Sequence, residues 1–145
     1  MILKDILGAK GNTVHCIEAD AALENAVRKL IEHNVGSLVI VARGPEGEQP
    51  VGIVTERDLL RYCASGACKL GPAKVSDLMS TKLVTASPDD RVDQIMGVMT
   101  QKRMRHLPVC EEGRLVGLVS IGDVVKAQHD RLAVENRFMR DYIQG

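Results

Sequence analysis

A hydroxyl side chain followed three residues later by an aspartate occurs twice in this sequence, each time in the same apolar context. The stretches are "VGIVTERDLLR", with Thr55 and Asp58, and "VGLVSIGDVVK", with Ser120 and Asp123. One interpretation is a capping box, in which the hydroxyl and the carboxylate bind backbone amides at the start of a helix. The other is a ligand site. Free amides and the helix dipole favour a phosphate there, and a carboxylate suits the vicinal hydroxyls of a ribose.

The two copies differ in the basic residues near these motifs. The first copy has Arg57 within its motif, where the second has apolar and glycine residues. The second carries Arg103, Arg105 and His106 before "LPV", where the first has only neutral residues. A guanidinium can bind a phosphate through two parallel hydrogen bonds, although cations at the end of a helix also simply complement its dipole. The difference predicts two sites with unequal preference for phosphate.

A longer repeated pattern positions these motifs. Residues 18–41 align with residues 87–110, and "LKDIL" at 3–7 aligns with "VSDLM" at 75–79. The first copy is longer because it contains loops such as "ARGPEGEQP", whose glycines and prolines indicate a surface turn. Two diverged copies of one unit explain the whole pattern.

Each unit is predicted to run strand, helix, strand, strand, helix. Apolar residues at three- and four-residue steps predict helices over about 23–31 and 92–99, with Asp20 and Asp89 as their N-caps. Short apolar runs such as "SLVIV" and "LVGLV" predict buried strands. A second helix is expected from about Glu56 and from about Ile121. We therefore expect an α/β (α+β) fold, with repeats over 1–68 and 69–130 packed through their sheets.

Residues 131–145 lie outside the repeats. The segment "RLAVENRFMRDYIQ" places Val134, Phe138 and Tyr142 at four-residue intervals, which predicts an amphipathic C-terminal helix. Two roles for its apolar side stay open, namely packing on the chain's own sheet and contact with a second copy.

Composition argues against several classes of protein. The 145 residues carry 19 basic and 19 acidic side chains, and aromatic residues make up 2%, so we expect no nucleic-acid partner. No apolar run approaches the roughly 20 residues that cross a bilayer, and the start lacks a signal peptide. We therefore expect no membrane partner and a cytoplasmic location, where the cysteines stay reduced. Those cysteines are Cys16, Cys63, Cys68 and Cys110.

Neither a metal site nor catalysis is predicted. The cysteine spacing does not match a zinc motif, and the sequence has no nucleophile elbow, phosphate-binding lysine loop or zinc-hydrolase helix. Cys110 with His106 could be imagined as a nucleophile and its base, but the position of Cys110 at a strand end favours packing.

The ordered set "VGIVTERD", "VGLVSIGD", "RHLPV" and "VTASPD" resembles tandem cystathionine-beta-synthase (CBS) domains, the Bateman module, of the short stand-alone bacterial type. The resemblance extends from about Leu3 to about His129. It implies two halves related by pseudo-twofold symmetry, dimers shaped as a flat disc, and clefts that bind adenosine-containing ligands. AMP, ATP or NAD(H) are expected ahead of S-adenosylmethionine.

Carried onto this chain, the resemblance implies that each motif aspartate holds a ribose and each motif hydroxyl lies near a phosphate. It also implies that basic residues before "LPV" contact a phosphate, in some members that of the ligand whose ribose the other repeat holds, so which cleft Arg105 and His106 serve stays open. The ligand-binding candidates are Thr55, Arg57, Asp58, Arg105, His106, Ser120 and Asp123. The expected function is a regulatory module that senses an adenine nucleotide and signals to an unknown protein through a change of shape or dimer angle. The alternative is a structural or protein-interaction subunit without a small-molecule ligand.

Overall fold

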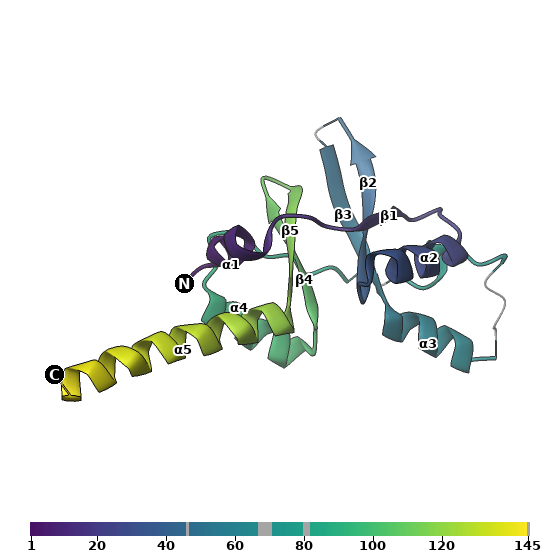
Figure 1. Ribbon diagram of the computed structural model, residues 1–145. Coiled ribbons are helices and arrows are strands. Elements are labelled where there is room, and N and C mark those ends of the chain that lie inside the picture. Colours follow the sequence, from purple (N-terminus) through teal and green to yellow (C-terminus); the bar gives the residue numbers. More distant parts are fainter. Residues whose placement is uncertain (46, 67–70, 80–81, 145) are drawn as a thin grey trace.

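The computed structural model describes residues 1–45, 47–66, 71–79 and 82–144. Two α/β halves lie side by side, and one long helix projects from the second half (Figure 1). The first half contains β1 (Cys16–Glu18), α2 (Leu23–His33), β2 (Ser37–Gly44), β3 (Gly47–Thr55) and α3 (Glu56–Ala64). The second contains α4 (Val92–Lys102), β4 (His106–Glu111), β5 (Arg114–Ser120) and α5 (Ile121–Gln144). Helix α1 (Leu3–Lys10) precedes the first half, and the 3-10 turn η1 (Val75–Asp77) precedes the second. The predicted α/β fold of two repeated units is confirmed.

The sheets show the same repeat in backbone detail. In the first, β1 pairs parallel to β2 and β2 pairs antiparallel to β3, while in the second β4 pairs antiparallel to β5. Each hairpin has a register shift, after Ile40 and after Val109. Both α2 and α4 end in a left-handed residue, Asn34 with φ 51° and Arg103 with φ 53°. The halves meet along β3 and β5, so the predicted packing through the sheets is confirmed.

The first strand of the second unit is shorter than its counterpart β1 in the first unit. It consists of one parallel bridge between Ala86 and Val109, whereas β1 forms a three-residue ladder. In the first half the amide of Val39 donates to the carbonyl of His15 at 3.1 Å. The matching position in β4 is Pro108, which has no amide hydrogen and so cannot extend the ladder.

The segments that precede the two repeats are exchanged between the halves. Leu3 and Leu7 of α1 lie in the hydrophobic core of the second half. Val75 of η1 lies in the core of the first half, beside Leu23. The hydrophobic core of each half is therefore completed by the segment that precedes the other repeat in the sequence.

This exchange explains why the prediction of Asp20 and Asp89 as N-caps was wrong. Helices α2 and α4 begin at Leu23 and Val92, as predicted, but their N-cap residues are Ala22 and Arg91, and neither has a side-chain cap. The first amide of α2 donates instead to the carbonyl of Ala73 at 2.9 Å, and that of α4 donates to the carbonyl of Met1 at 3.0 Å. Because backbone from the exchanged segments supplies the acceptors, no side-chain cap is needed.

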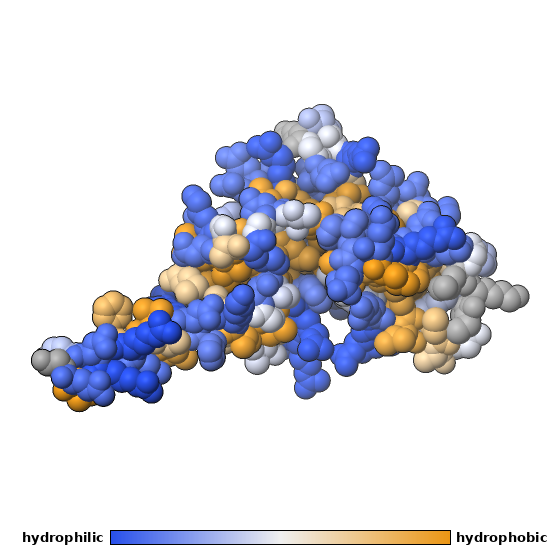
Figure 2. Space-filling view, in the orientation of Figure 1, coloured by the Kyte–Doolittle hydropathy of each residue, from blue (hydrophilic) through white to orange (hydrophobic). Residues whose placement is uncertain are grey.

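The predicted C-terminal helix is the continuation of α5, which runs unbroken over 24 residues and about 36 Å. Every side chain from residue 131 to residue 144 is exposed, including Phe138 at 72% and Tyr142 at 86%. Figure 2 shows apolar side chains on this projecting end of the molecule. Packing of this segment on the chain's own sheet, one of the two roles left open, is therefore wrong.

Within the described ranges, none of the helices combines the length and the apolar character that crossing a bilayer requires.

The docking of α1 on β5 depends on a glycine and gives a direct test of the exchange. A Cβ added at Gly117 would lie 2.7 Å from Cδ2 and 2.8 Å from Cδ1 of buried Leu7. We expect Gly117→Ala to lower the free energy of unfolding by about 1–3 kcal/mol, because overpacking strains a filled core. Urea denaturation measures the change. Gly97→Ala in α4 is the matched control, since a Cβ there meets nothing within 4 Å and alanine favours the helix. An equal effect of both substitutions would contradict this packing.

Candidate functional site

Both hydroxyl–aspartate motifs form capping boxes at the start of a helix. At α3, the amide of Thr55 donates to Oδ2 of Asp58 at 2.9 Å, and the amide of Asp58 donates to Oγ1 of Thr55 at 3.3 Å. At α5, the corresponding bonds between Ser120 and Asp123 measure 2.9 and 3.1 Å. Each backbone bond to the carboxylate uses Oδ2, so the cap leaves Oδ1 for another donor. The capping interpretation is confirmed, and it is compatible with ligand binding.

A cavity of about 410 Å³ lies between the two halves at the first motif. It is lined by Ile53, Thr55 and Asp58 from the first half, and by Lys82, Leu83, Val84, Lys102, Met104, Arg105, His106 and Pro108 from the second. Four of the seven predicted site residues therefore share one cavity, which combines the first motif with the basic segment of the other repeat. A volume of this size is within the range of small-molecule sites.

The cavity combines apolar and charged lining residues. Apolar surface comes from Ile53, Leu83, Val84, Met104 and Pro108, positive charge comes from Lys82, Lys102 and Arg105, and a carboxylate comes from Asp58. A flat apolar group fits the first environment and an anionic group fits the second.

His106 is a neutral partner in this cavity at pH 7. Burial, followed by the charge of Arg105, lowers the pKa of His106 below the usual range of histidine. The carboxylate of Asp123 acts in the opposite direction without reversing the shift. A neutral imidazole offers one donor and one acceptor, so His106 can orient a ligand by hydrogen bonding.

The second motif lies in a different environment. The ammonium group of Lys10, at the end of α1, donates to Oδ2 of Asp123 at 2.6 Å and to the carbonyl of Leu118 at 2.9 Å. Burial is the largest single influence on the pKa of Asp123, and taken alone it would raise that pKa. Hydrogen bonds from Lys10 and Ser120 together outweigh burial, so the net pKa of Asp123 lies below its usual value. Ser120 and Asp123 are not among the residues that line the 410 Å³ cavity.

Comparison with known proteins assigns the chain to a family. The family model described as "CBS domain" matches residues 4–65 and again residues 75–130. The chain belongs to the CBS domain family. The two matches are the two repeats, so the molecule is a CBS pair.

Three proteins illustrate the similarity. The CBS domain-containing protein CBSX3, mitochondrial, of Arabidopsis thaliana is 36% identical over 149 residues, which span 99% of this chain and 72% of that protein. The crystal structure of the CBS-domain containing protein ATU1752 from Agrobacterium tumefaciens has a TM-score of 0.80 and 38% identity, covering 88% of this chain and 99% of that one. The CBS domain pair of protein MJ0100, solved with 5′-methylthioadenosine and S-adenosyl-L-methionine, has a TM-score of 0.77 and 25% identity, covering 90% and 98%.

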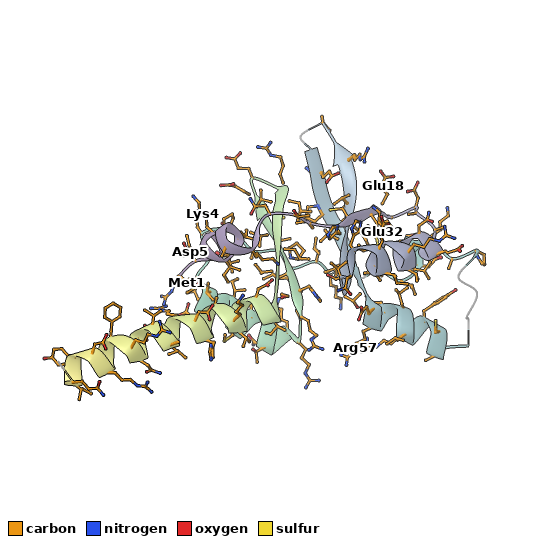
Figure 3. All side chains as sticks on the ribbon, in the orientation of Figure 1. Met1, Lys4, Asp5, Glu18, Glu32 and Arg57 are labelled. Atoms are coloured by element: carbon orange, nitrogen blue, oxygen red, sulfur yellow. The ribbon has the colours of Figure 1, made fainter. Side chains whose placement is uncertain are left out.

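Arg57 is not brought into the cavity of this CBS pair. Its side chain is exposed, and Figure 3 shows it at the N-terminal end of α3. The cavity is lined instead by two cations that the sequence analysis did not predict, Lys82 and Lys102. Lys102 directly precedes the basic run of the second repeat, which was the available signal. Lys82 follows η1 by only a few residues, and its place could not be read without the fold.

Two of the cysteines that the structure describes, Cys16 and Cys110, have thiols whose pKa is raised. Burial raises the pKa of the Cys110 thiol, and burial together with Glu48 raises that of Cys16, so both thiols stay protonated near pH 7. In the parts of the chain that the structure describes, no three His, Cys, Asp or Glu side chains are grouped to hold a metal ion. Cys68 lies outside the described residues.

The Lys10–Asp123 pair predicts a pH-dependent contribution to stability. The folded-state pKa of Asp123 is lowered, so its contribution is present above the unfolded-state value of about 3.9 and is lost as pH falls through the folded value. Both side chains are partly exposed, at 35% and 26%, so we expect Lys10→Met to lower the free energy of unfolding at pH 7 by at most about 1 kcal/mol.

Urea denaturation of the wild type and Lys10→Met at pH 7 and at pH 3 measures this contribution. The difference between the two proteins is expected to shrink at pH 3, because protonation of Asp123 as the pH falls removes the charge with which Lys10 pairs. A difference that stays constant with pH would show that Lys10 stabilises the fold by packing and not by its charge.

Proposed function

We propose that this CBS pair is a regulatory module that binds an adenine nucleotide in the cavity between its halves. The observation that carries the proposal is the composition of that cavity. A carboxylate at a helix start lines the same cavity as several apolar side chains and three cations that belong to the other repeat. An adenine nucleotide needs all three environments, namely the carboxylate for its ribose, the apolar side chains for its base and the cations for its phosphate.

The proposed orientation follows from the chemistry of the walls. The ribose hydroxyls donate to Oδ1 of Asp58, because Oδ2 already caps α3. The base lies against the apolar residues of β3 and β4. The phosphate lies toward Arg105, Lys82 and Lys102, where a charge-assisted hydrogen bond is stronger than a neutral one.

Charge also discriminates among adenosine ligands. The MJ0100 pair, of the same fold, was solved with 5′-methylthioadenosine and S-adenosyl-L-methionine. That supports an adenosine ligand here too. The sulfonium of S-adenosylmethionine would face Lys82, Lys102 and Arg105, whereas the phosphates of AMP, ATP or NAD(H) would neutralise them. We therefore propose a phosphate-bearing ligand.

The proposed mode of action is a change in the relation of the two halves. A ligand in this cavity touches Asp58 on the first half and Arg105 and His106 on the second. It can therefore favour one arrangement over another, provided that its affinity for the two differs. We propose that a regulated protein reads this change, and that the CBS pair itself is not an enzyme. The protonated thiol of Cys110 supports binding over nucleophilic catalysis.

We propose the projecting end of α5 as a contact between two copies of the chain. Leu132, Phe138, Met139, Tyr142 and Ile143 are all more than half exposed on it. Isolated helices are marginal in water and gain most of their stability from packing an apolar face, which a second copy would supply.

The free thiols of Cys16 and Cys110 support the further proposal of a reducing location such as the cytoplasm.

The nucleotide proposal predicts selective stabilisation by adenine ligands. Thermal unfolding with ATP, AMP, NAD, adenosine, S-adenosylmethionine and GTP should show the largest shift with a phosphate-bearing adenine ligand. A ligand at a hundred times its Kd adds about 2.7 kcal/mol to the folded state. Asp58→Asn should remove the shift while keeping most of the basal stability, because asparagine still offers an oxygen to the cap.

The matched control is Asp77→Asn, since Asp77 caps η1 in the same way and lies outside the cavity. We expect this variant to respond to ligand as the wild type does. If no adenine ligand shifts the transition, the capping boxes serve only to start helices. The CBS pair would then act through protein contacts alone, as the alternative function states.

The dimer proposal predicts a mass twice that of the chain in sedimentation equilibrium. Phe138→Ser together with Leu132→Ser should shift the protein toward the monomer, because both exposed side chains leave the proposed interface. Arg137→Ser, on the same segment, is the control and should leave the mass unchanged. A wild-type monomer would contradict the proposal.

A further inference from the structure

Two lysines occupy related positions before the two repeats. The offset that places Leu3 on Val75 and Asp5 on Asp77 also places Lys10 on Lys82. Lys82 lines the open cavity together with Asp58. Lys10 instead forms an ion pair with Asp123, the aspartate that corresponds to Asp58. The same kind of residue is therefore part of an open site at one motif and is bound directly to the aspartate at the other.

The contacts of Lys10 are those that a ligand would need. Its ammonium group is bound to the carboxylate of Asp123 at 2.6 Å and to the carbonyl of Leu118 at 2.9 Å. In the repeat alignment Leu118 corresponds to Ile53, which lines the open cavity. Lys10 thus binds Oδ2 of Asp123, the oxygen that also caps α5, and places a cation against the carboxylate that a second ribose would need, beside an acceptor on the adjoining strand.

The fold holds Lys10 in this place. Helix α1 approaches β5 closely because Gly117 leaves room for Leu7, and Lys10 follows Leu7 by one helical turn. The helix ends directly after it, at Gly11 with φ 96°. The facing carbonyl, of Leu118, belongs to the residue after Gly117. The packing of α1 into the core of the second half therefore also places the ammonium group of Lys10 beside Asp123.

The second motif also lacks the basic segment that completes the first. The positions of Arg105 and His106 correspond to Gly36 and Ser37 in the first repeat, so that segment brings no charge to Asp123. Lys10 supplies the positive charge there, and it does so by direct contact with the carboxylate.

We propose that Lys10 is a built-in competitor for the second ribose acceptor, so that the chain binds one adenosine ligand, in the open cavity. The second motif accepts a ligand only when Lys10 is removed or displaced. This inference rests on the proposed function, since it takes the motif aspartate to be the group that holds a ribose. It makes Lys10 the residue that sets the number of ligands per chain.

Isothermal titration with 5′-methylthioadenosine tests the inference. This probe has no phosphate, so it measures the contacts of the base and the ribose alone. The wild type should bind one molecule per chain, and Lys10→Ala should bind two. Asp58→Asn in the Lys10→Ala background should return the number to one, because only the second site then remains. Lys10→Met, which keeps most of the side-chain volume but not the charge, is the second variant for the case that Lys10→Ala is poorly folded.

The matched control is Lys4→Ala, which removes the same charge from the same helix (Figure 3), whereas the ion pair with Asp123 is formed by Lys10. It should bind one molecule per chain, as the wild type does. Binding of one molecule to both Lys10 variants, abolished by Asp58→Asn, would overturn the role of Lys10 and leave the proposed function intact. A wild type that already binds two, and loses one with Lys10→Ala, would make Lys10 a ligand contact and also overturn the inference.

The remaining outcomes separate the two proposals. If the probe binds Lys10→Ala once and the wild type not at all, the open cavity fails as a ligand site while the role of Lys10 holds. If no variant binds the probe, the inference falls together with the proposed ribose acceptors.

Discussion

The site depends on the exchange of segments between the two halves, and two backbone hydrogen bonds at the starts of α2 and α4 hold the exchanged segments in place. The amide of Leu23 donates to Ala73, and that of Val92 donates to Met1. Each bond ties a helix of one repeat to the segment that precedes the other, so neither half has a complete core without the exchange. The exchange fixes the two halves against each other along β3 and β5. It also determines which lysine reaches which aspartate, because Lys10 ends the exchanged helix α1 and Lys82 follows the exchanged turn η1.

The two interpretations of the repeated motif are not exclusive. A carboxylate that accepts the N-cap amide through Oδ2 is held in one rotamer, with Oδ1 directed elsewhere. A group fixed in this way loses little further freedom when a ligand binds, which favours affinity. Under the proposed function, the capping box therefore presents an acceptor to the ligand, and access to that acceptor depends on the surroundings of the motif.

Local features of the fold were predictable from the sequence, and features that depend on the exchange were not. The repeated hydroxyl–aspartate spacing predicted both capping boxes, and the apolar runs predicted β2 to β5, because these depend on neighbouring residues. Asp20 and Asp89 failed as caps because their competitors for the helix amides come from the other repeat. Pro108 lacks the amide hydrogen that would extend the first strand of the second unit. The proline is visible in the sequence, but its effect on that strand could be predicted only once the register of β4 was known. The contact of Lys10 with Asp123 joins residues at opposite ends of the chain, and no local pattern indicates it.

The two motifs also differ in what an occupied site can do to the molecule. The open cavity has walls from both halves, so a ligand there links Asp58 on one side to Arg105 on the other. The Lys10–Asp123 pair lies within one half, because α1 belongs to the core of the second half and Asp123 begins its last helix. Breaking that pair removes a contact within the second half, whereas a ligand in the cavity would contact both halves. Under the proposed function, an effect on a partner protein through the angle of the two halves would therefore originate at the first motif, and the second motif would only modulate it.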